Sequence, residues 1–214
     1  MSDMVFLVSF KKIINGKKQW NEIVHISENN FKKNNFKVRK IEGYNIKDHT
    51  EIKRNQIVYK NVLDKVLKKA HTYLLKNSNA NGFYIAEDDA FINLTLESLK
   101  KRLKEHDFSL SKKSGPLLRI GYQKKLKDNR FPRGYYCVGT QLIWIPKDQL
   151  KKLKIIMEQT TPQHFNGFLS KTMTINIELI PQSNKNRIVD EIEHESLTLG
   201  RIRRGRVLNK LDIL

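Results

Sequence analysis

The chain has 214 residues, of which 41 are Lys or Arg and 22 are Asp or Glu, giving a net charge of +19 at pH 7. This length suffices for one sizeable hydrophobic core, so we expect a single domain. No apolar stretch approaches the ~20 residues of a membrane-spanning helix, and the N-terminus lacks the pattern of a secretory signal. We therefore expect a soluble protein of the cytoplasm, or of the host cytoplasm if the chain is viral.

The positive charge favours an anionic partner, such as nucleic acid, a nucleotide or a membrane surface. Lys greatly outnumbers Arg, and Asn and Ile are frequent. An AT-rich genome would produce this composition without functional pressure, so the location of the charges is more informative than their sum. The single cysteine, Cys137, cannot form an internal disulfide and is flanked by apolar residues. We expect it in the core of a protein from a reducing compartment.

Apolar periodicity predicts alternating strands and helices in the first half of the chain. A lysine-rich turn follows the first strand, and a polar loop at 77–82 ends the longest helix. In chain order we expect a strand at Val5–Phe10, a helix at Trp20–Asn34, a strand at Phe36–Ile41, a helix at Val58–Leu74, a strand at Phe83–Ala86 and a helix at Thr95–Glu105.

The alternation continues in the second half and predicts an α/β fold, with a mixed sheet flanked by helices. We expect this domain to span 1–180, and residues 181–214 to form a basic C-terminal tail that packs on or near the active site. The remaining expected elements are a strand at Leu117–Gly121, a long strand at Tyr135–Ile145 ended by Pro146, helices at Lys147–Glu158 and Phe165–Met173, and a late strand at Ile175–Ile180.

Three consecutive acids, Glu87, Asp88 and Asp89, follow the apolar strand Phe83–Ala86 directly. In α/β sheets ligands gather at the carboxyl ends of strands. Carboxylates this close repel one another unless a cation or hydrogen-bond donors offset them, and Mg²⁺ or Mn²⁺ binds through such oxygens together with substrate phosphates. If the backbone stays extended, Glu87 and Asp89 share a face and can hold the metal. Alternatively, two of the acids cap the following helix and the third is solvated.

The segment FYIAEDDAFI, residues 83–92, resembles the metal and nucleotide-sugar motif of glycosyltransferase family 25, which includes lipopolysaccharide-building and collagen-modifying sugar transferases. Further segments are similar to that family in the same order: VFLVSF at 5–10, KVRKIEGYNI at 37–46 and YYCVGTQLIWIPKDQLKKL at 135–153. The resemblance implies a GT-A-like (Rossmann-like) fold, a divalent metal (Mn²⁺ or Mg²⁺) and a nucleotide-sugar donor, usually UDP-linked. The acceptor is then a hydroxyl group.

The resemblance also assigns roles to individual residues. The family has a further acid beyond the Gly-Thr strand, where this chain reads TPQHFNGF; either His164 takes that place as base or metal ligand, or the role lies elsewhere in the chain. The family's Ser-His pair on the helix before the acidic motif is missing here. Catalytic candidates are Asp88, Asp89 and His164; metal candidates are Glu87 and Asp89; donor-binding candidates are Phe10, Glu87, Asp88, Asp89, Arg201, Arg203 and Arg204.

Two basic stretches are candidates for binding a polyanion. Arginines suit phosphate through paired hydrogen bonds, so the C-terminal cluster folds over the donor diphosphate, holds DNA, or is simply solvated. A second stretch surrounds an Asp-Asn turn and is expected to be a mobile loop beside the site. The candidates for nucleic-acid contact are Lys124, Lys125, Lys127, Arg130, Arg133 and Arg206.

Three function classes remain open. The first is a glycosyltransferase whose acceptor is DNA carrying hydroxymethylated bases, or else a glycan or a protein; DNA would require basic walls and extrusion of the base. The second is a metal-dependent nuclease or phosphotransferase, which also uses carboxylates in a basic surround. The third is a non-enzymatic basic module that binds nucleic acid.

Overall fold

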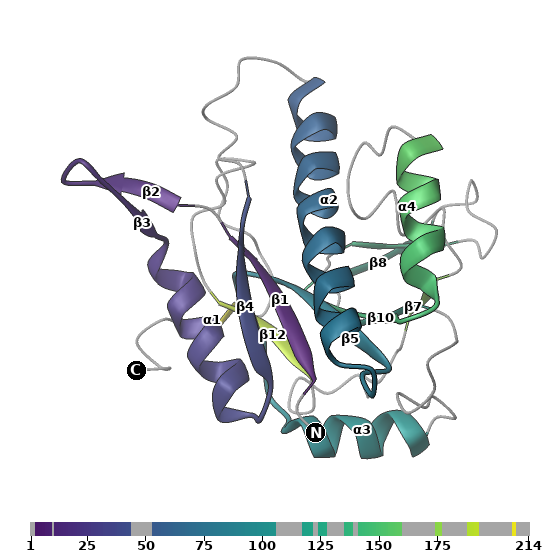
Figure 1. The fold of residues 1–214 in the computed structure, drawn as a ribbon. Helices are drawn as coiled ribbons and strands as arrows, with labels where there is room; N and C mark the ends of the chain where they lie inside the picture. Colours follow the sequence, from purple (N-terminus) through teal and green to yellow (C-terminus); the bar gives the residue numbers. More distant parts are fainter. Residues whose placement is uncertain are drawn as a thin grey trace.

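The centre of the fold is a six-stranded sheet in the order β11-β7-β10-β5-β1-β4 (Figure 1). The computed structural model describes residues 3–9, 11–43, 53–105, 117–121, 124–127, 135–138, 141–159, 174–176, 188–192 and 207–208. All neighbouring strands are parallel except β10, which is antiparallel to both β5 and β7. The strands are β1 (Met4–Ser9), β4 (Lys37–Glu42), β5 (Gly82–Glu87), β7 (Leu117–Gly121), β10 (Leu142–Pro146) and β11 (Thr174–Asn176).

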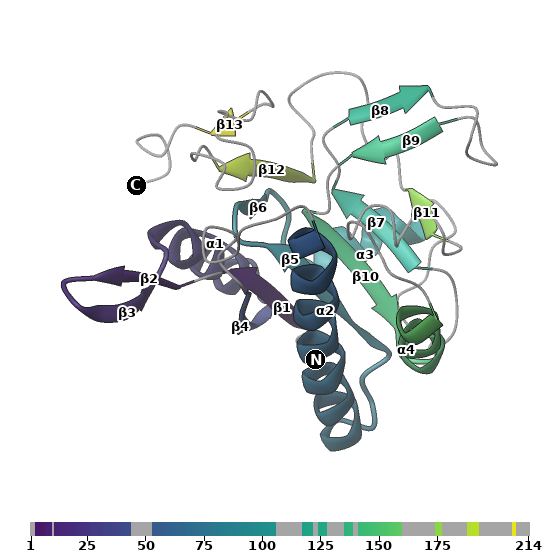
Figure 2. The same cartoon turned by 90° about the horizontal axis from the view of Figure 1, so that it is seen from above.

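Helices cover both faces of this sheet (Figures 1 and 2). Apolar residues of α1 (Glu22–Lys33) and α3 (Leu96–Glu105) belong to one buried cluster, and those of α2 (Lys53–Lys76) and α4 (Gln149–Gln159) to a second. Successive side chains of a strand point to opposite faces, so β5 contributes Tyr84 to the first cluster and Ile85 to the second. This arrangement confirms the predicted α/β fold with a mixed sheet between helices.

A hairpin between β1 and α1 is absent from the sequence expectations. It consists of β2 (Lys11–Ile14) and β3 (Lys17–Trp20), which pair antiparallel. Its turn residues Asn15 and Gly16 have φ values of 52° and 72°, the left-handed conformation that a two-residue hairpin turn of this kind requires. The prediction of a bare lysine-rich turn was therefore wrong, as was the inclusion of Trp20 in the helix.

Other boundaries differ in the second half of the chain. The single long strand predicted at Tyr135–Ile145 is wrong, because β9 (Tyr135–Val138) pairs with β8 (Lys124–Lys127) in a separate sheet while β10 belongs to the central one. Residues 124–127, predicted to lie in a loop, are thus a strand. The late strand begins at Thr174, and the helix predicted at Phe165–Met173 lies outside the described residues.

A second, three-stranded sheet follows the acidic turn directly. It contains β6 (Ala90–Ile92), β12 (Val189–Ile192) and β13 (Val207–Leu208) in the order β13-β12-β6. The antiparallel register places Val189 opposite Ile92 and Glu191 opposite Ala90. Part of the segment predicted as a polar tail is therefore paired beside the turn. None of the described helices combines the length and the apolar character needed to cross a bilayer.

Candidate functional site

Three parallel strands end at the same edge of the central sheet. In register, Ser9 at the end of β1 lies beside Glu42 at the end of β4, and Val8 lies beside Glu87 at the end of β5. The antiparallel β10 begins at this edge, where the Glu87 backbone N–H donates to the Gln141 carbonyl at 3.3 Å. Figure 2 looks down on the molecule from this side. Polar residues at this end of four neighbouring strands therefore lie at the edge where α/β proteins bind ligands.

The three acids differ in exposure, and the chain turns between them. β5 ends at Glu87, Asp88 and Asp89 form a turn, and β6 begins at Ala90. Glu87 and Asp88 are partly exposed, whereas Asp89 is 1% exposed. The backbone is therefore not extended through the triplet, so the geometric reason for pairing Glu87 with Asp89 does not apply.

Ser9 positions the middle carboxylate. Its hydroxyl donates to Asp88 Oδ2 at 2.7 Å, and Ser9 itself is 4% exposed. A hydrogen bond to a charged acceptor is stronger than one to a neutral acceptor, so this contact holds the Asp88 carboxylate against the end of β1. The sequence analysis gave Phe10 a role here but missed Ser9. Phe10 lies outside the described residues.

Helix α1 fixes the backbone of the turn and of β6. Ser27 Oγ lies 2.6 Å from the Asp88 carbonyl and 2.8 Å from the Ala90 carbonyl, within reach of its hydroxyl hydrogen. The Asn30 side chain accepts from the Ile92 N–H at 2.7 Å and donates to the Ile92 carbonyl at 3.1 Å. Sequence reasoning missed both residues. Their signal is positional, because they are polar residues on the buried stripe of an amphipathic helix.

Glu42, the acid at the end of β4, is engaged by the hairpin. The ammonium group of Lys18 lies 2.6 Å from Glu42 Oε1, and that of Lys11 lies 3.6 Å from Oε2. The hydrogen bond from Lys18 lowers the pKa of the Glu42 carboxyl, against the opposing effect of burial. Glu42 therefore stays ionised, with its charge offset by these two lysines.

Gln141 lies directly opposite Glu87, one step beyond the Leu142–Ala86 pair. It is 3% exposed, and neither its amide nitrogen nor its amide oxygen has a hydrogen-bond partner in the described part of the chain. A second buried polar residue, Arg119 of β7, is 2% exposed and opposes Ile143 in the register of β10. Arg119 thus brings a buried positive charge to the sheet, opposite the residue that lies two positions after Gln141.

The carboxylates fit a particular kind of metal site. Within the described ranges, no three His, Cys, Asp or Glu side chains converge as a metal cage does. Mg²⁺ and Mn²⁺ often bind through one or two carboxylates and complete their coordination with water and substrate phosphate. Glu87 and Asp88 supply two partly exposed carboxylates at neighbouring positions. This donor set fits a metal that arrives with a phosphorylated substrate.

The remaining predicted site residues are not placed by the structure. Lys124, Lys125 and Lys127 belong to strand β8, whose backbone alone is described. The other candidates lie outside the described residues: His164, Arg130, Arg133, Arg201, Arg203, Arg204 and Arg206. Of the predicted residues, the structure thus brings together only the three acids, and it adds Ser9, Ser27, Asn30 and Gln141 to them.

No protein-family model matches the sequence, and no curated protein does. Among solved structures, the chain is similar to a glycosyltransferase involved in the glycosylation of the major capsid of PBCV-1, at 12% sequence identity and a TM-score of 0.40, over 74% of this chain and 66% of that one. The chain thus spans just under two thirds of that protein's length. It is also similar to a protein from STIV, at 12% identity and a TM-score of 0.38, over 83% of this chain and 82% of that one. Likenesses this distant assign neither family nor activity.

Proposed function

We propose that the protein is a metal-dependent glycosyltransferase that moves a sugar from a nucleotide-diphosphate sugar, UDP-linked, to a hydroxyl acceptor. One observation carries the proposal: the partly exposed carboxylates of Glu87 and Asp88 stand at the carboxyl ends of parallel strands, in a turn that α1 holds from behind. When bound, a divalent cation would stabilise the charge that develops on the departing diphosphate. The motif resemblance to family 25 points to the same chemistry.

Two assignments of the metal ligands make different predictions. The sequence pairs Glu87 with Asp89, whereas exposure favours Glu87 with Asp88, because Asp89 is enclosed. We assign the metal to Glu87 and Asp88, and we assign Asp89 to shaping the turn from inside. Under this assignment Asp88→Asn abolishes metal-dependent donor binding in a protein that still folds. Under the alternative, Asp89→Asn has that effect and Asp88→Asn does not.

A thermal-shift panel of UDP-, GDP- and CMP-sugars, with and without Mn²⁺, tests the proposal. A ligand at 100 times its dissociation constant adds about 2.7 kcal/mol of stability, which is roughly 5–10 °C for a domain of this size. Glu87→Gln, which removes a proposed metal ligand, should lose this metal-dependent stabilisation. Glu97→Gln, which removes an exposed acid on the distant helix α3, should keep it and is the matched control. The proposal fails if no nucleotide sugar stabilises the wild-type protein in the presence of metal.

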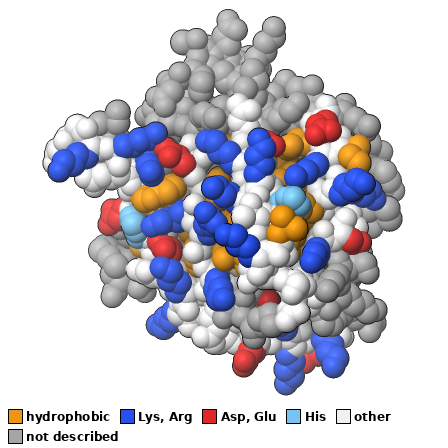
Figure 3. Space-filling view, in the orientation of Figure 1, with side chains coloured by type: hydrophobic (Ala, Val, Ile, Leu, Met, Phe, Trp, Pro, Cys, Tyr) orange, Lys and Arg blue, Asp and Glu red, His pale blue; other side chains and the backbone are white. Residues whose placement is uncertain are grey.

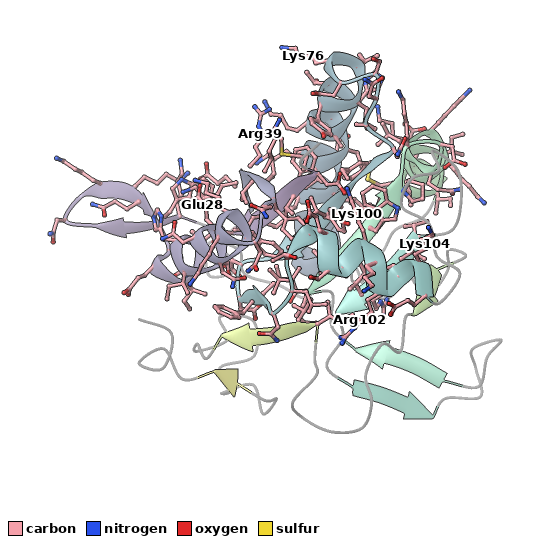
Figure 4. The ribbon with its side chains drawn as sticks, turned by 90° about the horizontal axis from the view of Figure 1, so that it is seen from below. Glu28, Arg39, Lys76, Lys100, Arg102 and Lys104 are labelled. Atoms are coloured by element: carbon pink, nitrogen blue, oxygen red, sulfur yellow. The ribbon has the colours of Figure 1, made fainter. Side chains whose placement is uncertain are left out.

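The acceptor is proposed from charge alone, as a polyanion, with DNA carrying hydroxymethylated bases as the sharpest candidate. In the described part, cations are spread over several elements rather than gathered at one place. Figure 3 shows Lys and Arg mixed with acids and apolar groups on one face. Figure 4, seen from below, shows Lys100, Arg102 and Lys104 on α3, with Arg39 and Lys76 on β4 and α2. A DNA surface would therefore have to include the basic stretches at 124–133 and 201–206.

Two assays separate the proposal from its rivals. Filter binding to duplex DNA over a salt series measures the contribution of phosphate contacts, and an absence of salt-sensitive binding removes DNA as the acceptor. Incubation of labelled DNA with Mg²⁺ tests for a nuclease, whereas transfer of labelled sugar from UDP-sugars tests for the proposed activity. A pure binding module would retain DNA binding after Asp89→Ala and gain no stability from any nucleotide sugar.

A further inference from the structure

The amide of Gln141 is the most unusual group at the candidate site. The residue is 3% exposed, and its side-chain nitrogen and oxygen both lack hydrogen-bond partners in the described part of the chain. Burying such a group without a partner lowers the stability of the folded state. Buried polar groups in folded proteins are nearly always satisfied, so an exception calls for an explanation. A bound ligand is one such explanation.

The placement of Gln141 shows where that ligand would lie. Gln141 directly precedes β10, and its carbonyl accepts from the Glu87 N–H. One step beyond the Leu142–Ala86 pair, the register brings Gln141 opposite Glu87, and directly opposed residues of such a pair project their side chains to the same face with Cβ atoms about 4.5–5.5 Å apart. One step further along this face, Ile85 and Ile143 belong to the buried cluster shared with α2 and α4. Glu87 is partly exposed, whereas the amide atoms of Gln141 are covered in the free protein, so a ligand at the Glu87 carboxylate meets the amide once the side chains that cover it shift.

The hydrogen-bonding capacity of the pair restricts the chemistry of the ligand. An ionised carboxylate only accepts hydrogen bonds, whereas a primary amide both donates and accepts. A phosphate only accepts hydrogen bonds, so it could pair with the amide nitrogen of Gln141 but not with the amide oxygen. Sugar hydroxyls donate and accept, so vicinal hydroxyls can pair with both atoms of the amide. A nucleobase edge also presents both kinds of group, but it lies a ribose and two phosphates away from the transferred sugar.

We propose that Gln141 is the residue that selects the sugar of the nucleotide-sugar donor, by hydrogen-bonding its hydroxyls beside Glu87. This proposal rests on the proposed function, because it places the sugar next to the carboxylates that hold the metal and the diphosphate. The unpaired amide then has its partners only in the donor complex. The stability lost by burying the amide in the free protein is recovered when the sugar binds.

The test compares Gln141→Met, which keeps length and volume but removes both polar atoms, with the control Gln149→Met on helix α4. Isothermal titration in Mn²⁺ gives the affinity of each protein for UDP and for a panel of UDP-sugars. We expect Gln141→Met to bind UDP within twofold of wild type, to lose tenfold or more in affinity for the UDP-sugar that wild type prefers, and to melt at the same or a higher temperature without ligand. Gln141→Asn, which shortens the amide but keeps its polarity, should lose affinity for the sugar in the same way.

Each other outcome overturns the proposal in a recognisable manner. Equal losses for UDP and UDP-sugar would place Gln141 against the base or the phosphates. A lower melting temperature of ligand-free Gln141→Met would show a structural amide, and unchanged affinity for UDP-sugar would show one without a role. If wild type binds neither UDP nor any UDP-sugar, the proposed function itself has failed, and the selection of a sugar fails with it.

Discussion

Replacing Asn30 with alanine tests whether α1 holds the acidic turn in place. Asn30 is 8% exposed, and its side chain bonds both polar backbone groups of Ile92, which is itself 1% exposed. Ile92 ends the short strand that begins directly after Asp89. In Asn30→Ala these contacts vanish, and the Ile92 N–H is left without its side-chain acceptor in a region that water does not reach.

The size of the effect follows from the two lost bonds. Leaving a buried group unsatisfied costs about 1–3 kcal/mol. The Ile92 N–H bears this cost in full, while the Ile92 carbonyl keeps a longer contact to Asn34 Nδ2 at 3.4 Å. Alanine has a higher helix propensity than asparagine, which returns under ~0.7 kcal/mol. The expected net loss is about 0.3–2.3 kcal/mol, or roughly 1–9 °C in melting temperature.

Urea unfolding followed by circular dichroism measures this loss, with Asn29→Ala as the control. Asn29 is the exposed neighbour on the same helix, so its replacement changes propensity without touching β6. If Asn30→Ala and Asn29→Ala agree within about 0.5 kcal/mol, then α1 does not hold the turn and the account of the site is wrong. In a folded Asn30→Ala protein we also expect weaker donor binding, because Asp88 and Asp89 precede the released strand.

Three further predictions concern packing, pH and the serine at the edge. Gly82→Ala should destabilise the protein by about 1–3 kcal/mol or more, because a Cβ there would lie 2.3 Å from the Ile145 carbonyl oxygen; a thermal melt like that of wild type would contradict this. Burial acts to raise the pKa of the Glu28 carboxyl, but hydrogen bonds from lysines 2.7 and 2.6 Å away outweigh it and lower the pKa below its ordinary 4.5. The stability that these ion pairs contribute is present above pH 4.5 and is lost as the pH falls further. In urea unfolding, Glu28→Gln should therefore lower stability at pH 7 but not near pH 3. An equal loss of stability at both pH values would refute the ion pairs. Ser9→Ala should lower the free energy of unfolding by about 1.5–3 kcal/mol, because it removes a hydrogen bond to the charged Asp88. It should also weaken metal-dependent donor binding; an unchanged donor affinity in calorimetric titration would exclude a positioning role for Ser9.

Much of the fold could be predicted because buried strands and helices have a recognisable pattern of apolar residues in the sequence. The apolar runs at Val5–Phe10 and Phe83–Ala86 became the parallel strands β1 and β5, which lie at the centre of the sheet. Strands buried on both faces read as continuous apolar segments. The Asn15-Gly16 hairpin carried an equally local signal and was missed only because its strands are rich in lysine. The residues within each of these segments are thus enough to predict the strand that it forms.

The site was harder to predict because its geometry depends on partners distant in sequence. The three acids were found, but whether they share a face depends on a turn that Ser27 and Asn30 hold from 61 and 62 residues away. The pairing of β6 with β12 joins segments about a hundred residues apart and starts directly after Asp89. No spacing rule within a short window specifies such contacts, so the sequence could name the three acids as candidates but could not give their arrangement.

Replacing a residue that holds this edge together should lower the stability of the ligand-free protein, whereas replacing a residue that binds ligand there should raise stability or leave it unchanged. Asn30 satisfies buried backbone groups in the free protein, so its removal lowers stability. The Gln141 amide has no described partner in the free protein, so replacing it by an apolar isostere removes a cost and raises stability or leaves it unchanged. Proteins tolerate such locally unfavourable groups mainly where function requires them. A loss of stability at Asn30 together with a gain at Gln141, measured in the same ligand-free protein, would therefore identify the acidic edge as a binding site before its ligand is known.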